Sequence, residues 1–125
     1  ALLEQIGEDP EREGLVETPL RVSKAWEEWT AGYHYNPEEV IKAFTEPSSG
    51  DQLVFQGGIP LYSLCEHHLA PFFGVAHIGY IPRDKVVGLS KLSRVTDVFS
   101  RRLSIQERVT NQIADALMEN LSPVG

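Results

Sequence analysis

Leu64-Cys65-Glu66-His67-His68-Leu69 is the stretch that decides how this chain folds, because it holds the only cysteine and two of the four histidines. The residues before it, 59–64, have the composition of a strand, and the pattern changes after it. Positions i and i+3 point to opposite faces of a strand but share a face on a helical turn. Cys65 and His68 can therefore reach one metal ion only if the chain bends, and we predict a turn at the end of a strand.

Cys65 and His68 are the natural metal-ligand pair of this stretch, since a thiolate and an imidazole both bind zinc. The competing interpretation is structural, because a lone cysteine is usually a small buried hydrophobe and Cys-x-x-His often occurs by chance. A catalytic zinc usually has three protein ligands, so the pair is one short. We place His77 in a strand interior and His34, between two tyrosines, in a structural or exposed position, so the third ligand must be sought elsewhere.

Composition limits the class of protein. With 125 residues and 42% hydrophobic content, the chain fits one globular domain. The net charge of −7 argues against general affinity for nucleic acid. No apolar run approaches the roughly 20 residues that span a bilayer, and no leader pattern precedes the first helix, so we expect no membrane association and a cytoplasmic location. The single cysteine excludes an internal disulfide.

A basic cluster follows the cysteine–histidine stretch, between residues 83 and 108. Ser90 is a plausible N-cap of a helix over 90–102, and Lys91 and Arg94 lie one turn apart near its start. Free N–H groups and the helix dipole favour an anion there, such as phosphate. The alternative is an ordinary capped helix with a solvated basic face.

The remaining pattern predicts helices before the cysteine–histidine stretch and strands around it. We predict Thr18 as an N-cap with Pro19 at the first helical position. Trp26 and Trp29 fall on one face, which suits a core or a subunit interface. The other expected elements are a helix fragment over 1–6, a short helix from Asn36-Pro37 through Phe44, a surface loop over 45–50, strands over 52–56 and 59–64 joined by a tight Gly57-Gly58 turn, a bent strand over 72–81, a short return over 86–89 and a helix over 105–117.

Glu107 has two interpretations. Ser104 and Glu107 have the spacing of a capping box, which would hold the start of the helix over 105–117. A functional Glu107 would instead accept paired N–H groups from a purine or pterin ring. Spacing alone favours the cap.

Several segments in fixed order resemble the GTP cyclohydrolase I family, and together they are far more specific than any one of them. They are Gly7-Glu8-Asp9-Pro10, Glu17-Thr18-Pro19-x-Arg21, Ser63-Leu64-Cys65-Glu66-His67-His68, Pro71-Phe72-Phe73-Gly74, Gly79-Tyr80-Ile81-Pro82, Gly88-Leu89-Ser90-Lys91-Leu92, Arg94 and Gln106-Glu107-Arg108. The resemblance implies an α+β tunnelling fold, an antiparallel sheet with helices packed on one face plus N-terminal helices. Residues 1–50 would form the N-terminal helical region and residues 51–125 a partial catalytic domain, in a single functional unit.

The resemblance also implies a function. Family members are toroidal homodecamers with active sites between subunits, and they use one zinc ion to convert GTP to 7,8-dihydroneopterin triphosphate and formate, the first step of folate and pterin biosynthesis. The family pattern assigns zinc to Cys65 and His68 and proton transfer to His67. It assigns binding of the guanine edge to Gln106 and Glu107. It assigns binding of the triphosphate or ribose end of GTP to Ser90, Lys91 and Arg94.

The chain departs from the family pattern in three respects. The third zinc ligand of the family is a cysteine in a downstream segment, so we expect it, and further C-terminal strands, beyond Gly125. Ser104 stands where the family usually has Gln, and Ser93 where Ala is common.

A second hypothesis takes the chain literally, as a catalytically incomplete purine-triphosphate-binding or assembly subunit of the same fold. A third hypothesis is another tunnelling-fold enzyme of pterin or deazapurine metabolism. The sites of those enzymes lack this combination of segments, which argues against it.

Overall fold

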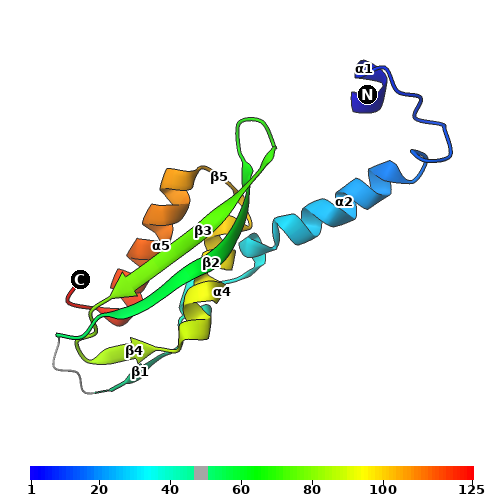
Figure 1. The fold of residues 1–125 in the computed structure, drawn as a ribbon. Coiled ribbons are helices and arrows are strands. Elements are labelled where there is room, and N and C mark those ends of the chain that lie inside the picture. The colour runs from blue at the N-terminus through cyan, green and yellow to red at the C-terminus, as the bar shows by residue number, and fades with distance from the viewer. Residues whose placement is uncertain (47–50) are drawn as a thin grey trace.

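The computed structural model describes residues 1–46 and 51–125 (Figure 1). Its helices are α1 (Leu2–Gln5), α2 (Thr18–Trp29), the short 3-10 helix η1 (Ala31–His34), α3 (Pro37–Val40), α4 (Leu89–Ser100) and α5 (Gln106–Leu121). Its strands are β1 (Ala43–Thr45), β2 (Val54–Cys65), β3 (Pro71–Tyr80), β4 (Lys85–Val87) and β5 (Leu103–Ser104). The α+β class predicted from the sequence is confirmed.

A long hairpin dominates the larger sheet, in which the strand order is β3-β2-β5. β2 and β3 pair antiparallel from Val54 opposite Tyr80 to Leu64 opposite Pro71. The predicted turn at Gly57-Gly58 is wrong, because β2 runs through both glycines as one strand with an irregular register there. Gly58 has φ +67, a conformation that suits a bulge as well as a turn. The glycine pair therefore marks an unusual backbone conformation, but the neighbouring residues do not show whether it is a bulge or a turn.

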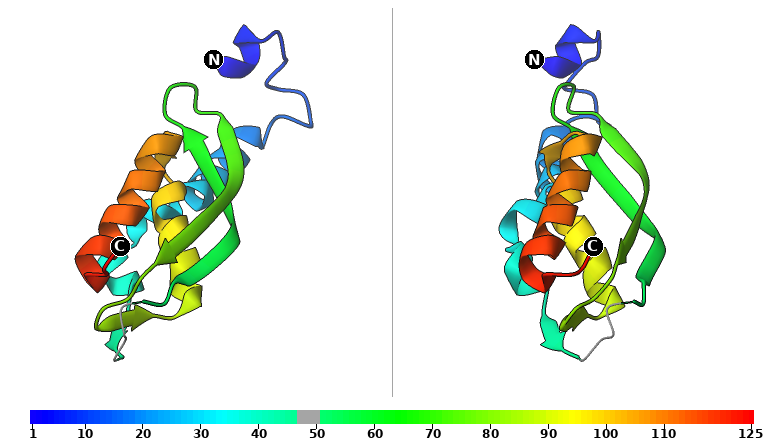
Figure 2. Two further views of the ribbon diagram at one scale, coloured as in Figure 1. Left: turned by 60° about the vertical axis from the view of Figure 1, so that its left-hand side comes forward. Right: turned by 90° about the vertical axis from the view of Figure 1, so that its left-hand side faces the viewer.

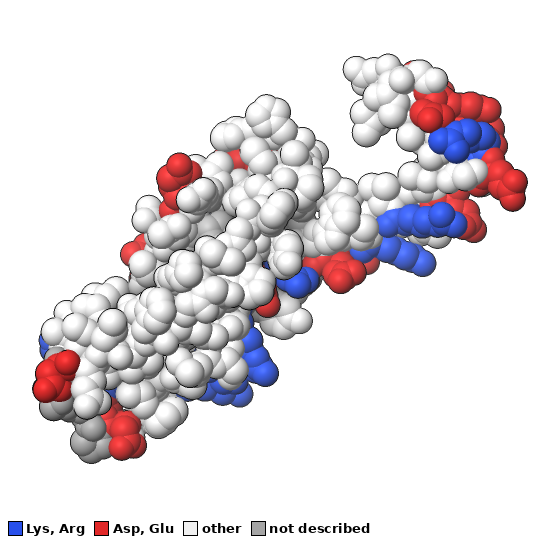
Figure 3. All heavy atoms as spheres, viewed as in Figure 1, with Lys and Arg blue, Asp and Glu red and all other residues white. Residues whose placement is uncertain are grey.

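Helices α4 and α5 cover one face of this sheet, as Figure 2 shows from two sides. Apolar side chains of the two helices and the hairpin form the core, which includes Ile59, Ile78, Leu92, Val109 and Leu121. The other face of the sheet is open, and Phe73 on it is 81% exposed. Figure 3 shows that the surface over the hairpin is uncharged, whereas charged side chains gather on the N-terminal arm.

Both predicted serine caps differ from the structure. The N-cap of α4 is Gly88 and Ser90 is already helical, while the N-cap of α5 is Ile105, without a side-chain cap. Ser104 instead belongs to β5, is 2% exposed and pairs with Cys65 in the parallel ladder. The capping-box interpretation of Glu107 is therefore wrong, because sheet pairing takes Ser104 out of the helix start.

The N-terminal region projects from the body as an arm, with α2 leading away from η1 (Figure 1). No α2 residue is buried, and Trp29 is half exposed. Thr18 is the first helical residue of α2 rather than its cap. No helix within residues 1–46 and 51–125 has both the length and the apolar character needed to cross a membrane.

A small second sheet corrects the expected helix over 36–44. Asn36 caps α3 by accepting the Glu38 N–H, but this helix ends at Val40. Ala43–Thr45 then forms β1, which pairs antiparallel with β4. The loop predicted over 45–50 lies outside the described residues at 47–50, and Thr45 is the last residue of β1.

Candidate active site

The cysteine–histidine stretch forms the loop of the long hairpin. Cys65 is the last residue of β2, and its N–H donates to Ala70 O at 2.7 Å, while Leu69 N–H donates to Cys65 O at 2.8 Å. Leu69 takes the left-handed conformation, with φ 55. These bonds close a tight turn before β3, which confirms the predicted bend at the end of a strand.

The turn brings Cys65 and His68 together. Cys65 Sγ lies 3.7 Å from His68 Nδ1. Two donors on one tetrahedral zinc, with Zn–S about 2.3 Å and Zn–N about 2.0 Å, are roughly 3.5 Å apart, so the pair fits a shared zinc ion. Within residues 1–46 and 51–125, no group of three His, Cys, Asp or Glu side chains is placed to hold a metal. The structure thus supplies two ligands.

The Cys65 thiol is prepared for metal binding. The pKa of the thiol is lowered to about 7. The largest cause is its hydrogen bond with the His68 side chain, and the backbone N–H groups of His67 and His68 contribute less. Since the thiolate is the metal ligand and the nucleophile, a large fraction of Cys65 is reactive at neutral pH.

We expect Cys65 in metal-free protein to be alkylated by iodoacetamide at a rate half-maximal near pH 7. His68→Ala removes the largest cause of the lowered pKa, so the midpoint should move to higher pH. His77→Ala, on β3, is the matched control and should leave the midpoint unchanged. Peptide mass spectrometry gives the rates, and an unmoved midpoint in His68→Ala would contradict the contact.

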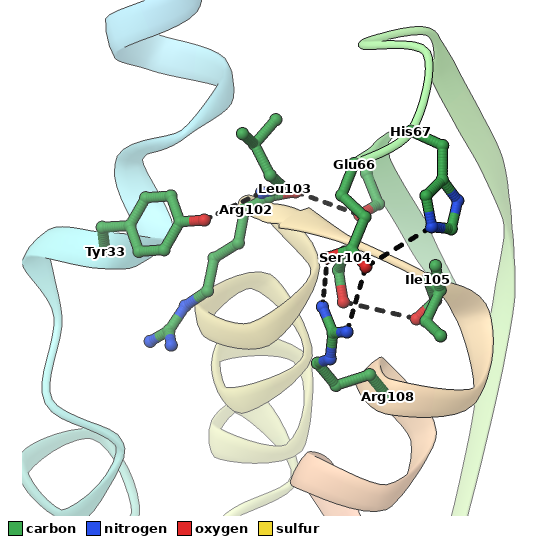
Figure 4. A network of polar contacts seen from close by, with 9 residues as sticks. Tyr33, Glu66, His67, Arg102, Leu103, Ser104, Ile105 and Arg108 are labelled. Carbon is green, nitrogen blue, oxygen red and sulfur yellow. Dashed lines mark hydrogen bonds and ion pairs between the residues drawn. The ribbon is translucent and has the colours of Figure 1, made fainter.

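Glu66 points toward Arg108 of α5, and His67 points toward Glu66 (Figure 4). Arg108 of α5 donates to both carboxylate oxygens of Glu66, with Nη2 3.0 Å from Oε1. This contact lowers the pKa of Glu66 and raises that of Arg108. His67 Nε2 lies 3.8 Å from Glu66 Oε1, and its side chain is 66% exposed. Sequence reasoning missed the Glu66–Arg108 pair.

Parallel pairing places the start of α5 beside the turn. Leu64 and Cys65 of β2 align with Leu103 and Ser104 of β5, and Glu66 N–H donates to Ser104 O at 3.1 Å. Gln106 and Glu107 follow at once, in the first turn of α5, and both are exposed. Two of the predicted substrate-binding residues are thereby close in the fold to Cys65, His67 and His68.

The other predicted substrate-binding residues lie elsewhere. Ser90, Lys91 and Arg94 are on the first two turns of α4, which begins beside β4, whereas the cysteine–histidine turn lies at the opposite end of the molecule (Figures 1 and 2). A helix of this length spans about 18 Å. Lys91 and Arg94 line a cavity of about 870 Å³ between α4 and the η1–α3 segment, which no residue of the turn lines.

His77 lies inside a strand, as its flanking residues predict. It lies in β3, its ring stacks on Phe55 with centroids 6.3 Å apart, and its Nδ1 accepts the Gly58 N–H at 3.2 Å. The imidazole therefore supports the irregular part of β2.

A second hollow of about 430 Å³ runs between β3 and α5. Apolar side chains, including Leu61, Phe72, Ile113 and Leu117, line it together with Gln106. Among the described strands, β3 is at the edge of its sheet on this side.

Comparison with known proteins adds an independent observation. The family model for GTP cyclohydrolase I matches residues 1–125. A protein of Janthinobacterium sp. named GTP cyclohydrolase 1 is 55% identical over 124 residues, which are 98% of this chain and 63% of that protein. Relatives of the same name from Chlorobium chlorochromatii and Corynebacterium glutamicum are 53% and 58% identical, over 99% and 96% of this chain and 56% and 62% of theirs. The chain thus spans less than two thirds of the length of these relatives.

Proposed function

Because the chain belongs to the GTP cyclohydrolase I family, we propose that it acts as a zinc-dependent GTP cyclohydrolase. The reaction opens the imidazole ring of GTP by hydrolysis and gives 7,8-dihydroneopterin triphosphate and formate, the first step of folate and pterin biosynthesis. The proposed architecture is the tunnelling fold, and the proposed location is the cytoplasm.

One observation carries the proposal: a cysteine–histidine pair at zinc spacing lies beside the exposed first turn of α5. Cys65 and His68 would hold zinc, which when bound supplies a Lewis acid that activates water for attack on C8 of the purine. His67, whose Nε2 lies 3.8 Å from Glu66 Oε1, would carry the proton to the departing ring nitrogen. Gln106 and Glu107 would bind the guanine edge, where a carboxylate accepting two N–H groups selects against adenine.

The positions of Lys91 and Arg94 support an assembly with sites between subunits. These cations, with Ser90, would bind the triphosphate or ribose end of GTP, but they lie at the far end of α4 from the turn. A neighbouring copy would bring its own basic cavity to the turn. We therefore propose a homo-oligomer, a decamer by family resemblance, with GTP as its substrate.

The edge of β3 supports a further part of the proposal. Among the described strands, none pairs with the outer edge of β3 beside the apolar hollow. Such an edge is suited to additional strands, because it offers free N–H and C=O groups. We propose that residues 51–125 are completed by C-terminal strands, as the greater length of the relatives suggests, and that these carry the third zinc ligand. Residues 1–50 would form the N-terminal region of the same functional unit.

The test uses the full-length protein loaded with zinc and incubated with GTP. We expect formate and a pterin that becomes fluorescent after oxidation, with neither product from ATP or from chelator-treated protein. Zinc-loaded protein that binds GTP without releasing formate would contradict the proposed reaction. It would instead favour the alternative, a catalytically incomplete purine-triphosphate-binding or assembly subunit.

A further inference from the structure

We propose that the Glu66–Arg108 ion pair is a positioning device that fixes the cysteine–histidine turn against the start of α5. The proposal rests on the proposed function for the meaning of the two parts that it aligns. One part carries the proton donor His67, and the other carries Gln106 and Glu107, which would hold the guanine. Neither Glu66 nor Arg108 needs to touch the substrate.

The geometry of the pair is that of a rigid clamp. Arg108 presents two nitrogens to two carboxylate oxygens of Glu66, the fork arrangement that fixes direction as well as distance. The partners are 42 residues apart in sequence, so the contact joins separate elements rather than stabilising one helix. The side chains of Glu66 and Arg108 are 30% and 44% exposed, so water reaches the pair. We therefore expect the pair to contribute to the orientation of the two elements rather than to the stability of the fold.

The clamp acts on one side of the turn only. Cys65 and His68 are held by the closure of the turn itself, through Cys65 N–H to Ala70 O and Leu69 N–H to Cys65 O. Toward α5, Glu66 ties the turn through its side chain to Arg108 and through its N–H to Ser104 O, beside the ladder pair of Cys65 with Ser104 (Figure 4). Loss of the clamp should therefore disturb the alignment of His67 with α5 and spare the metal pair.

The test is a double-mutant cycle in the full-length, zinc-loaded protein with Glu66→Gln, Arg108→Gln and the double variant. We expect each single variant to lower kcat by roughly tenfold to a hundredfold, because small misplacements of reacting groups are costly. The KM for GTP and the zinc affinity, measured by competition with a chelating dye, should change less than about threefold. The double variant should be no slower than either single variant, since both remove one contact.

Two further variants separate positioning from charge. Arg108→Lys keeps the charge but loses the fork, so its kcat should fall between wild type and Arg108→Gln. Glu8→Gln is the matched control, because Glu8 also accepts two hydrogen bonds from one arginine, Arg12 of the N-terminal arm, and its kcat should equal wild type. Multiplied effects in the double variant, wild-type kcat in the single variants, or a parallel loss of zinc would each overturn the proposal.

Hydrogen exchange keeps the structural claim testable without turnover. The Glu66 amide, which donates to Ser104 O, should exchange at least tenfold faster in Glu66→Gln and Arg108→Gln, while amides in the middle of β2 stay protected. Unchanged exchange at Glu66 would overturn the clamp even if wild-type protein released no formate. A wild type without formate release contradicts the proposed function alone, so the two failures are distinguishable.

Discussion

Gly32→Ala is expected to destabilise the protein by about 3 kcal/mol and to lower its Tm by about 10 °C. Gly32 is buried in η1, and a Cβ added there would lie 2.3 Å from Val98 O and 2.7 Å from Arg101 O. Contacts below 3.0 Å force atoms to move, and both neighbours are backbone carbonyls of the α4 end, which cannot swing aside as a side chain would.

Hydrogen bonds around Gly32 make such movement costly. Its N–H donates to Arg101 O at 3.0 Å, and its carbonyl accepts Arg102 Nη2 at 3.1 Å. Arg102 Nε in turn donates to Val98 O at 2.7 Å, so one guanidinium ties both sides of the contact. Separating η1 from α4 to admit a methyl group would strain all three bonds, and with them the attachment of the N-terminal arm.

Gly74→Ala is the matched control, because a Cβ added at this position of β3 would have no heavy atom within 4 Å. We expect its stability to equal or slightly exceed wild type. Urea and thermal unfolding at one fixed protein concentration measure both variants. Equal midpoints for Gly32→Ala and wild type would show that η1 and α4 are not packed as described.

The features predicted correctly from sequence are those decided by neighbouring residues. The bend at Cys65–His68 follows from a strand pattern that ends at the ligand pair, and the helices α4 and α5 follow from apolar periodicity. The wrong prediction of a turn at Gly57-Gly58 also came from looking at neighbouring residues alone. Positive φ serves a bulge and a turn equally, and only the continuous pairing of β2 with β3 distinguishes them.

The features that sequence reasoning missed depend on distant pairing. Ser104 looks like a cap until Cys65 takes it into the parallel ladder, and its hydroxyl then donates to Ile105 O at 3.3 Å. Arg108 looks like one more exposed charge until the fold brings Glu66 to it. The spacing of charges along a chain carries no signal for a contact between a hairpin loop and a helix start.

The candidate site was predicted as a set of residues but not as an arrangement. Cys65, His67 and His68 share one turn, so their proximity follows from their spacing. The addition of Gln106 and Glu107 required β5, a two-residue strand without a distinct sequence pattern. The separation of Lys91 and Arg94 from all of them was not foreseen, because the family pattern names roles without stating where in the fold each residue lies.

His67→Ala in the full-length protein is expected to slow formate release from GTP by about 10²-fold or more while zinc content stays at the wild-type level. The metal pair explains why zinc is spared: Cys65 Sγ and His68 Nδ1 face each other, whereas His67 Nε2 is directed to Glu66. The rate falls because positioned proton transfer is lost, while the metal and the guanine contacts remain.

The controls for His67→Ala separate proton transfer from metal binding and from folding. His34→Ala, an exposed histidine of η1, should retain wild-type kcat, and His68→Ala should lose zinc and activity together. Since the His67 side chain is 66% exposed, added imidazole should reach the vacated position and restore part of the rate in His67→Ala. Wild-type turnover in His67→Ala would refute its role as proton donor, and zinc loss in step with activity would make it a ligand instead.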